Sequence, residues 1–174
     1  MNIKICHILI FYLLILCTVS CHKVEIIKTR YTGSLNSDLI NDSWESPDPV
    51  YRKLVYSGIE AFNIGNYDAS YDYLQNATLV CPNRWVAYYY LGLIADTNHE
   101  YKEALENLNK SLLYIPGGHS ARSLIYLALG ETNLSLGNYS LAEQHLLTSL
   151  NINPDFKPAQ ACLERLKQIG QLTN

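Results

Sequence analysis

Few residues in this chain have the types and spacing that chemistry would require. In the stretch HEYKE, residues 99–103, a zinc-binding helix would need a second histidine at position 103, where glutamate stands. His119 precedes Ser120, but neighbours in sequence lack the geometry of a nucleophile and its base, and a turn is the simpler interpretation. Glycine-rich phosphate loops, paired-cysteine metal motifs and esterase elbows do not occur in the sequence. The sequence therefore predicts no enzyme, no metal site and no cofactor.

Cys21 is the residue with the clearest chemical role, because it follows a segment that has the form of a targeting signal. Lys4 precedes an apolar run of 12 residues, Ile5 to Leu16, and short side chains lead from there to the cysteine. Such a run suits the core of a signal peptide and is too short to span a bilayer. We therefore expect residues 1–20 to be removed.

The residues TVSC, 18–21, resemble a bacterial lipobox, in which a small residue precedes the cysteine that is lipidated and becomes the first residue of the mature protein. The resemblance implies a lipoprotein-type signal peptide over residues 1–20, fatty acyl chains such as palmitate on Cys21, and a lipid-anchored polar tether over residues 21–48. Several acyl chains on one cysteine give a durable anchor. Thr18 stands where the family usually has leucine, so cleavage after Ser20 without lipidation remains the alternative.

The lipobox resemblance also implies a location. A protein of this kind is anchored in the bacterial cell envelope, whereas the alternative cleavage gives a secreted or periplasmic protein. His22 is not the aspartate that retains many lipoproteins at the inner membrane, which favours the outer membrane in a cell that has one.

Composition and charge narrow the class of protein. The 174 residues are 48% hydrophobic and 17% charged, as expected of one globular domain with a core. The 13 basic and 16 acidic residues give a net charge of −3, which shows no basic face and points neither to nucleic acid nor to anionic lipid headgroups. Cys81 and Cys162 are far apart in sequence and are expected to be small packed residues without a disulfide.

Three segments share one pattern, residues 51–84, 85–118 and 123–156, and the first two repeat with a period of 34 residues. The third follows an insertion at residues 119–122. The shared positions are Gly58, Gly92 and Gly130; Tyr67, Tyr101 and Tyr139; Ser70, Ala104 and Ala142; Leu74, Leu108 and Leu146; Ala77, Ser111 and Ser149; Pro82, Pro116 and Pro154. Each segment has the spacing of two helices, and a glycine in the middle of the first helix indicates that the second passes too close for a larger side chain.

This pattern resembles the tetratricopeptide repeat (TPR) family. The resemblance implies an all-α fold, a right-handed superhelical array of three helix hairpins, with residues 157–170 as a capping helix. Asp48 and Pro49 form an N-cap and first-residue pair that begins the first repeat. The insertion is expected to lengthen the first helix of the third repeat, with Ser120 as a candidate N-cap.

The family's partner-binding positions lie on the concave face of the first helices. The resemblance places the binding groove at Arg52, Val55, Ile59, Phe62, Val86, Tyr89, Leu93, Leu124, Leu127 and Leu134. The lysine and asparagine set that clamps a C-terminal carboxylate in chaperone-binding members is absent. An apolar groove of this kind suits an apolar helix or extended segment of a partner protein.

The stretch WVAYYYLGLIA, residues 85–95, is apolar on every side of a helix, so something must cover it. Three occupants of the groove stay open: residues 22–48 of the same chain, a foreign protein, or a second copy through self-association. The favoured function is a membrane-anchored adaptor for protein–protein interactions that assembles an envelope complex. The alternative is a transporter-accessory lipoprotein that binds a small apolar ligand.

Overall fold

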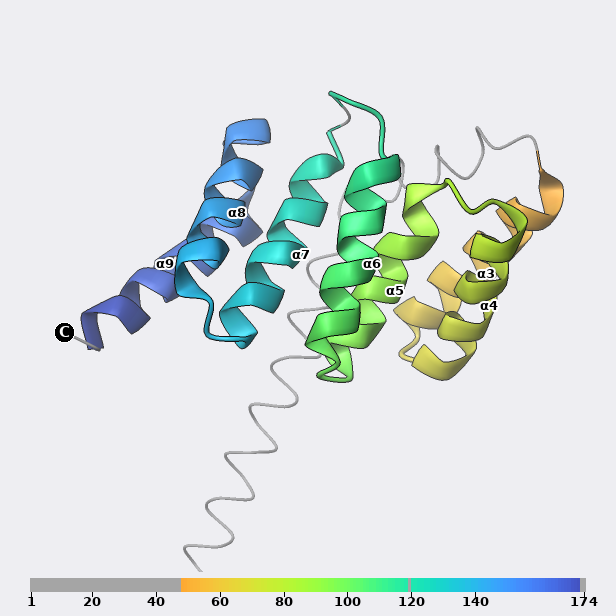
Figure 1. The fold of residues 1–174 in the computed structure, drawn as a ribbon, viewed down its shortest axis with the longest axis horizontal. Helices are drawn as coiled ribbons and strands as arrows, with labels where there is room; N and C mark the ends of the chain where they lie inside the picture. The colour runs from red at the N-terminus through yellow and green to blue at the C-terminus, as the bar shows by residue number, and fades with distance from the viewer. Residues whose placement is uncertain (1–47, 119, 173–174) are drawn as a thin grey trace, which may run out of the picture. The chain divides into compact units, whose positions relative to one another are not determined.

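The structure is a computed structural model and describes residues 48–118 and 120–172. Over these two ranges the chain forms seven α-helices and no strand (Figure 1). They are α3 (Pro49–Asn63), α4 (Tyr67–Val80), α5 (Trp85–Thr97), α6 (Tyr101–Tyr114), α7 (Arg122–Ser135), α8 (Tyr139–Ile152) and α9 (Lys157–Leu172). The predicted signal peptide, Cys21 and the tether up to residue 47 lie outside the described residues.

The helices pack as three consecutive hairpins, α3 with α4, α5 with α6 and α7 with α8. Each second helix also packs on the next first helix, and α9 closes the series against α8 and α7. The first helices contact one another in turn, α3 with α5 and α5 with α7. The prediction of an all-α array of hairpins with a further helix at its C-terminal end is confirmed.

Each hairpin is closed by contact between a glycine and a leucine. A Cβ atom at Gly58, Gly92 or Gly130 would lie 2.7–2.8 Å from the Cγ atom of Leu74, Leu108 or Leu146. Such a separation is shorter than carbon atoms tolerate, so only glycine allows the two helices this spacing. The repeated glycine therefore marks a close helix–helix approach, as the sequence predicted.

The turns inside the hairpins share a left-handed residue. Gly65 and Gly137 end α3 and α7 with φ values of 81° and 76°. His99 occupies the same position after α5 with a φ of 65°, and it is the one non-glycine residue with positive φ among those described. A left-handed residue after a helix allows the chain to reverse.

The helix starts are fixed in different ways. The Asp48 carboxylate accepts hydrogen bonds from the backbone N–H groups of Val50 and Tyr51 at 2.8 and 3.1 Å, and Pro49 is the first residue of α3, as predicted. Of residues 119–122, which were predicted to lengthen the next first helix, only Arg122 is part of it. Helix α7 begins at Arg122, and its cap residue Ala121 makes no side-chain cap bond. Gly118, with φ of 79°, keeps the connection out of a helix, so Ser120 precedes the cap and does not form it.

Small residues fill the space between paired helices. Ala104, Ala142 and Ser149 have no exposed surface. The Ser149 hydroxyl donates to the carbonyl oxygen of Ser123 at 2.7 Å and so joins α8 to α7. Cys81 and Cys162 are free thiols. In the described ranges no helix is both long enough and apolar enough to cross a bilayer.

Candidate binding surface

The candidate surface is the side of the first helices that faces away from the second helices, which we call the first-helix face. Helices α3, α5 and α7 form this layer because each hairpin places its first helix beside the next first helix. A partner lying across the layer would contact three helices at once, as in helix-in-groove recognition.

The predicted groove residues all lie on these three helices. Arg52 and Ile59 are half-buried, whereas the other eight are buried. The buried eight are Val55, Phe62, Val86, Tyr89, Leu93, Leu124, Leu127 and Leu134. The first-helix face is therefore apolar, with Arg52 as the charged member of the predicted set. Val55, Val86 and Tyr89 have no exposed surface.

A chain of aromatic rings joins the first two hairpins. The Phe62 ring of α3 lies 5.1 Å from the Tyr90 ring of α5 at an angle of 73°, and 5.4 Å from the Tyr67 ring of α4. Tyr90 continues to Tyr89 at 5.4 Å, and Tyr89 to Trp85 at 6.3 Å. Edge-to-face pairs of this kind contribute about 0.5–1.5 kcal/mol beyond their buried area. Tyr90 and Trp85 were not among the predicted groove residues, although their stretch was recognised as apolar on all sides.

Helix α5 is the most deeply packed element. Every residue from Trp85 to Ala95 is buried except Tyr88, which is half-buried. The sequence prediction that this helix is covered on all sides is confirmed. The Tyr88 hydroxyl donates to the carbonyl oxygen of Pro82 at 2.9 Å, and the Lys110 ammonium lies 5.7 Å from the ring centre. Tyr88 therefore belongs to the outer surface beside α6 and not to the first-helix face.

A pocket of about 310 Å³ lies between α4 and the turn from α5 to α6. Its polar lining includes four carboxylates, from Asp68, Asp72, Glu100 and Glu103, and two tyrosines. Among the described residues no group of three or more His, Cys, Asp or Glu side chains has the geometry to hold a metal ion. The pocket is polar and none of the predicted groove residues lines it, so its chemistry differs from that of the predicted groove.

The fold and this layered surface define the class as a TPR array. The tetratricopeptide repeat family model matches residues 124–156, within the third predicted repeat. No curated protein sequence matches the chain.

Solved structures support the same class. The chain is similar to the Sgt2 TPR domain of Aspergillus fumigatus, with a TM-score of 0.65 and 17% identity, over 74% of this chain and 84% of that one. It is also similar to the second TPR domain of human RPAP3 in complex with an HSP70 peptide, with a TM-score of 0.58 and 19% identity over 67% and 98% of the two chains. The third is the type III secretion chaperone SycD of Yersinia enterocolitica in complex with a peptide of the translocator YopD, with a TM-score of 0.61 and 16% identity over 72% and 98%. The TPR fold is confirmed by these matches.

Proposed function

We propose that this protein is a lipid-anchored adaptor of a bacterial cell envelope that binds an apolar peptide or helix of a partner protein on the first-helix face. The single observation that carries the proposal is the set of apolar and aromatic side chains that three adjacent first helices bring together. The TPR fold is typical of protein–protein interaction, and two similar structures hold peptides. Those peptides belong to those proteins, and the partner of this chain is defined here only by its apolar chemistry.

The binding step in this proposal includes an opening of the face. Tyr89 and Val86 are fully buried at the centre of the three helices. A partner that inserts an apolar side chain there must first displace whatever covers these two residues, so its apparent affinity is lowered by the fraction of chains in which they are accessible. The half-buried residues Arg52 and Ile59 give a partner its first contacts.

Ile59→Asp tests the proposed surface because Ile59 is only half-buried, so the fold should tolerate the change. We expect the variant to lose its partner in co-purification from native membranes, since a carboxylate in an apolar interface costs several kcal/mol. Ile64→Asp is the matched control, because Ile64 is 73% exposed in the turn after α3. Equal partner recovery by the two variants would contradict the proposed surface.

Lipid attachment is tested separately. We expect the full chain to incorporate radiolabelled palmitate in bacterial cells and to fractionate with membranes, and Cys21→Ser to lose both properties. Retention of the label in Cys21→Ser would contradict the anchor at this residue. The outer membrane is the expected fraction in a cell that has one.

The alternative function is the binding of a small apolar ligand by a transporter-accessory lipoprotein. The pocket beside α4 does not suit it, because carboxylates and tyrosine hydroxyls line its wall. An apolar ligand gains nothing from those groups and leaves them desolvated. This pocket therefore gives the small-ligand alternative no support.

A further inference from the structure

The hairpins sort the charges of the array into two edges. Because the helices alternate in direction, the starts of α3, α5, α7 and α9 lie at the same edge as the ends of α4, α6 and α8 (Figure 1). We call this the basic edge because it carries six basic residues and only two acidic ones. The basic residues are Arg52, Lys53, Arg84, Lys110, Arg122 and Lys157, and the acidic ones are Asp48 and Asp155. Its net charge is therefore +4.

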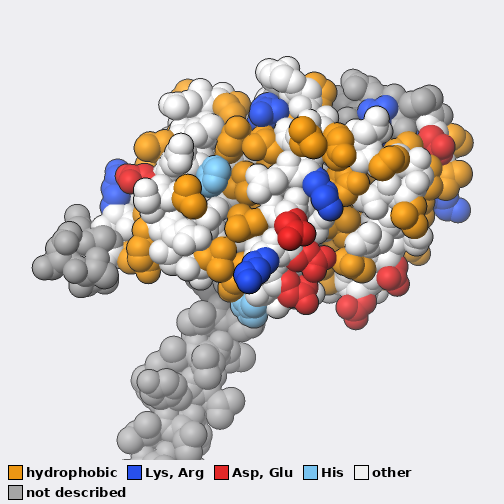
Figure 2. All heavy atoms as spheres, in the orientation of Figure 1, with side chains coloured by type: hydrophobic (Ala, Val, Ile, Leu, Met, Phe, Trp, Pro, Cys, Tyr) orange, Lys and Arg blue, Asp and Glu red, His pale blue; other side chains and the backbone are white. Residues whose placement is uncertain are grey.

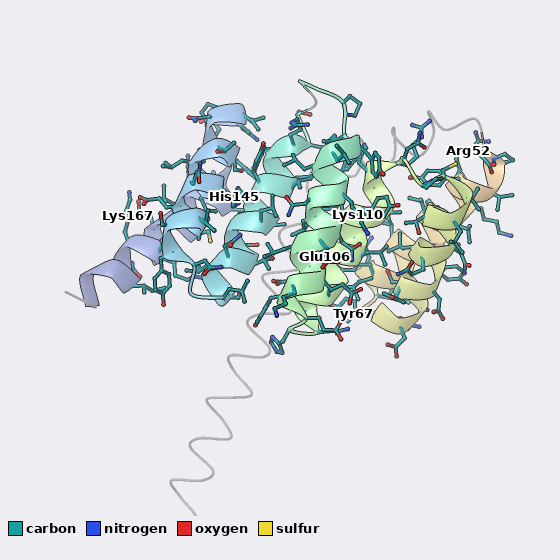
Figure 3. The ribbon with its side chains drawn as sticks, in the orientation of Figure 1. Arg52, Tyr67, Glu106, Lys110, His145 and Lys167 are labelled. Atoms are coloured by element: carbon teal, nitrogen blue, oxygen red, sulfur yellow. The ribbon has the colours of Figure 1, made fainter. Side chains whose placement is uncertain are left out.

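The opposite edge holds the other ends of the helices and the turns inside the hairpins. From α3 to α8 it carries nine acidic residues and one basic residue, Lys102. Figure 2 shows acidic side chains gathered over the lower parts of α4 and α6, where these two helices begin. Figure 3 shows Lys110 above Glu106 on α6. Helix α9 departs from this arrangement, since Glu164, Arg165 and Lys167 all lie in its second half or at its middle. The net charge of −3 for the whole chain does not report this separation, because it sums both edges.

The basic edge also exposes large apolar side chains at equivalent places. Leu79 and Leu113, which are 34 residues apart, are 79% and 73% exposed at the ends of α4 and α6. Val80, Tyr114 and Ile152, at the ends of α4, α6 and α8, are also exposed. Lysines with exposed leucine and tyrosine neighbours are the residues that bind the interface of an anionic membrane, where the alkyl chains contact lipid and the ammonium groups contact phosphate.

The chain enters the array at this same edge. Helix α3 begins at Pro49, capped by Asp48, so residues 21–47 connect the proposed lipid on Cys21 to the basic edge.

We propose that the basic edge docks on a membrane surface that contains anionic phospholipid headgroups, with Lys53, Lys110 and Lys157 contacting phosphates and Leu79 and Leu113 entering the interface. The inference rests on the proposed membrane location and adds the orientation of the array. The acidic edge then faces away from the membrane, and the first-helix face lies between the two.

The test uses the chain from residue 21 with Cys21→Ser, which carries no lipid, so that a failure of the proposed lipid anchor does not affect it. This chain keeps all seven described helices, and circular dichroism checks that they form. Its binding is measured by sedimentation with phosphatidylcholine vesicles and with vesicles that also contain phosphatidylglycerol. We expect binding to the mixed vesicles, weakened by added salt. Each of Lys53→Gln, Lys110→Gln and Lys157→Gln should weaken it about fivefold, and the triple variant about 100-fold.

Two matched controls accompany these variants. Lys102→Gln, at the acidic edge, should bind like the parent. Leu113→Asp should lose binding, whereas Ile64→Asp should not, although both positions are 73% exposed. The proposal is overturned when the chain binds neither vesicle, when it binds both equally, or when the control variants lose as much binding as the basic-edge variants. It is also overturned when the basic-edge variants keep vesicle binding and instead lose an acidic protein partner.

Discussion

Gly92 of α5 and Leu108 of α6 pack so closely that a methyl group at position 92 would lie 2.8 Å from the Leu108 Cγ atom. The same methyl group would lie 3.2 Å from the carbonyl oxygen of Ala104. The backbone oxygen and the branched carbon have little room to move, so the contact sets the distance between the two helices of the middle hairpin.

Gly92→Ala should therefore destabilise the protein, although alanine is the better helix former by about 1 kcal/mol. Overpacking costs about 1–3 kcal/mol, so we expect a net loss of up to about 2 kcal/mol in the free energy of unfolding. Denaturant unfolding measures it. In a Leu108→Ala background the same change should become stabilising by about 1 kcal/mol, because the obstructing side chain is gone. A loss of equal size in both backgrounds would show that Leu108 is not the obstacle.

Ser149 and Ser111 occupy equivalent positions but should respond differently to alanine. The buried Ser149 hydroxyl donates to the Ser123 carbonyl, whereas the buried Ser111 hydroxyl has no hydrogen-bond partner among the described residues. Ser149→Ala should cost about 1 kcal/mol, and Ser111→Ala should be neutral or stabilising. Thermal unfolding of the two variants gives the comparison. Equal losses would mean that the hydrogen bond at Ser149 contributes nothing specific.

His99 should be replaceable by glycine with a gain in stability. It has a φ of 65° at the place where the other hairpins have Gly65 and Gly137. A left-handed conformation costs an L-residue about 1–2 kcal/mol, and the hydrogen bond from His99 to Tyr101 is exposed, so His99→Gly should stabilise by about 1 kcal/mol. Gly137→Ala should destabilise for the converse reason. Denaturant unfolding gives the free energy of unfolding of each variant for comparison with that of the parent chain. A loss of stability in His99→Gly would contradict this account of the turn.

His145 should make the protein less stable in mild acid. Its ring stacks on Tyr126 with centroids 6.1 Å apart, and burial lowers its pKa below the ordinary histidine value of 6.5. The unfolded chain then binds the proton more readily than the folded chain, so stability is complete above pH 6.5 and falls as the pH drops toward the folded pKa. His145→Gln should remove this part of the pH dependence of the melting temperature while carboxylate titration remains. An unchanged pH profile in the variant would contradict it.

The sequence predicted the fold well because its most constrained residues are local and repeated. The three mid-helix glycines, the turn glycines Gly65 and Gly137, and the Asp48 cap each have one physical use, and each use is found in the structure. The start of α7 was less predictable. Ser120 is a good N-cap residue, but Gly118 before it takes a left-handed conformation, and a single sequence does not show which local preference prevails.

The candidate surface was predictable only in part. The resemblance to the TPR family placed all ten predicted positions on first helices, where they lie, but it does not show that Tyr89 is fully buried. The charge separation was not recognised because a net charge sums over the whole chain. Lys110 and Glu106 are four residues apart in sequence, and they fall on opposite halves of α6 in the folded array.

Photo-crosslinking from position 89 in native cells tests the central claim most directly, because the benzoyl-phenylalanine side chain resembles the Tyr89 side chain that it replaces. Position 59 on the same face is a second probe, and position 79, whose leucine is 79% exposed at the basic edge, is the control. The adaptor account predicts one discrete foreign protein captured from positions 59 and 89 and not from position 79. Capture only of residues 22–48 of the same chain, or only of a second copy, would contradict it.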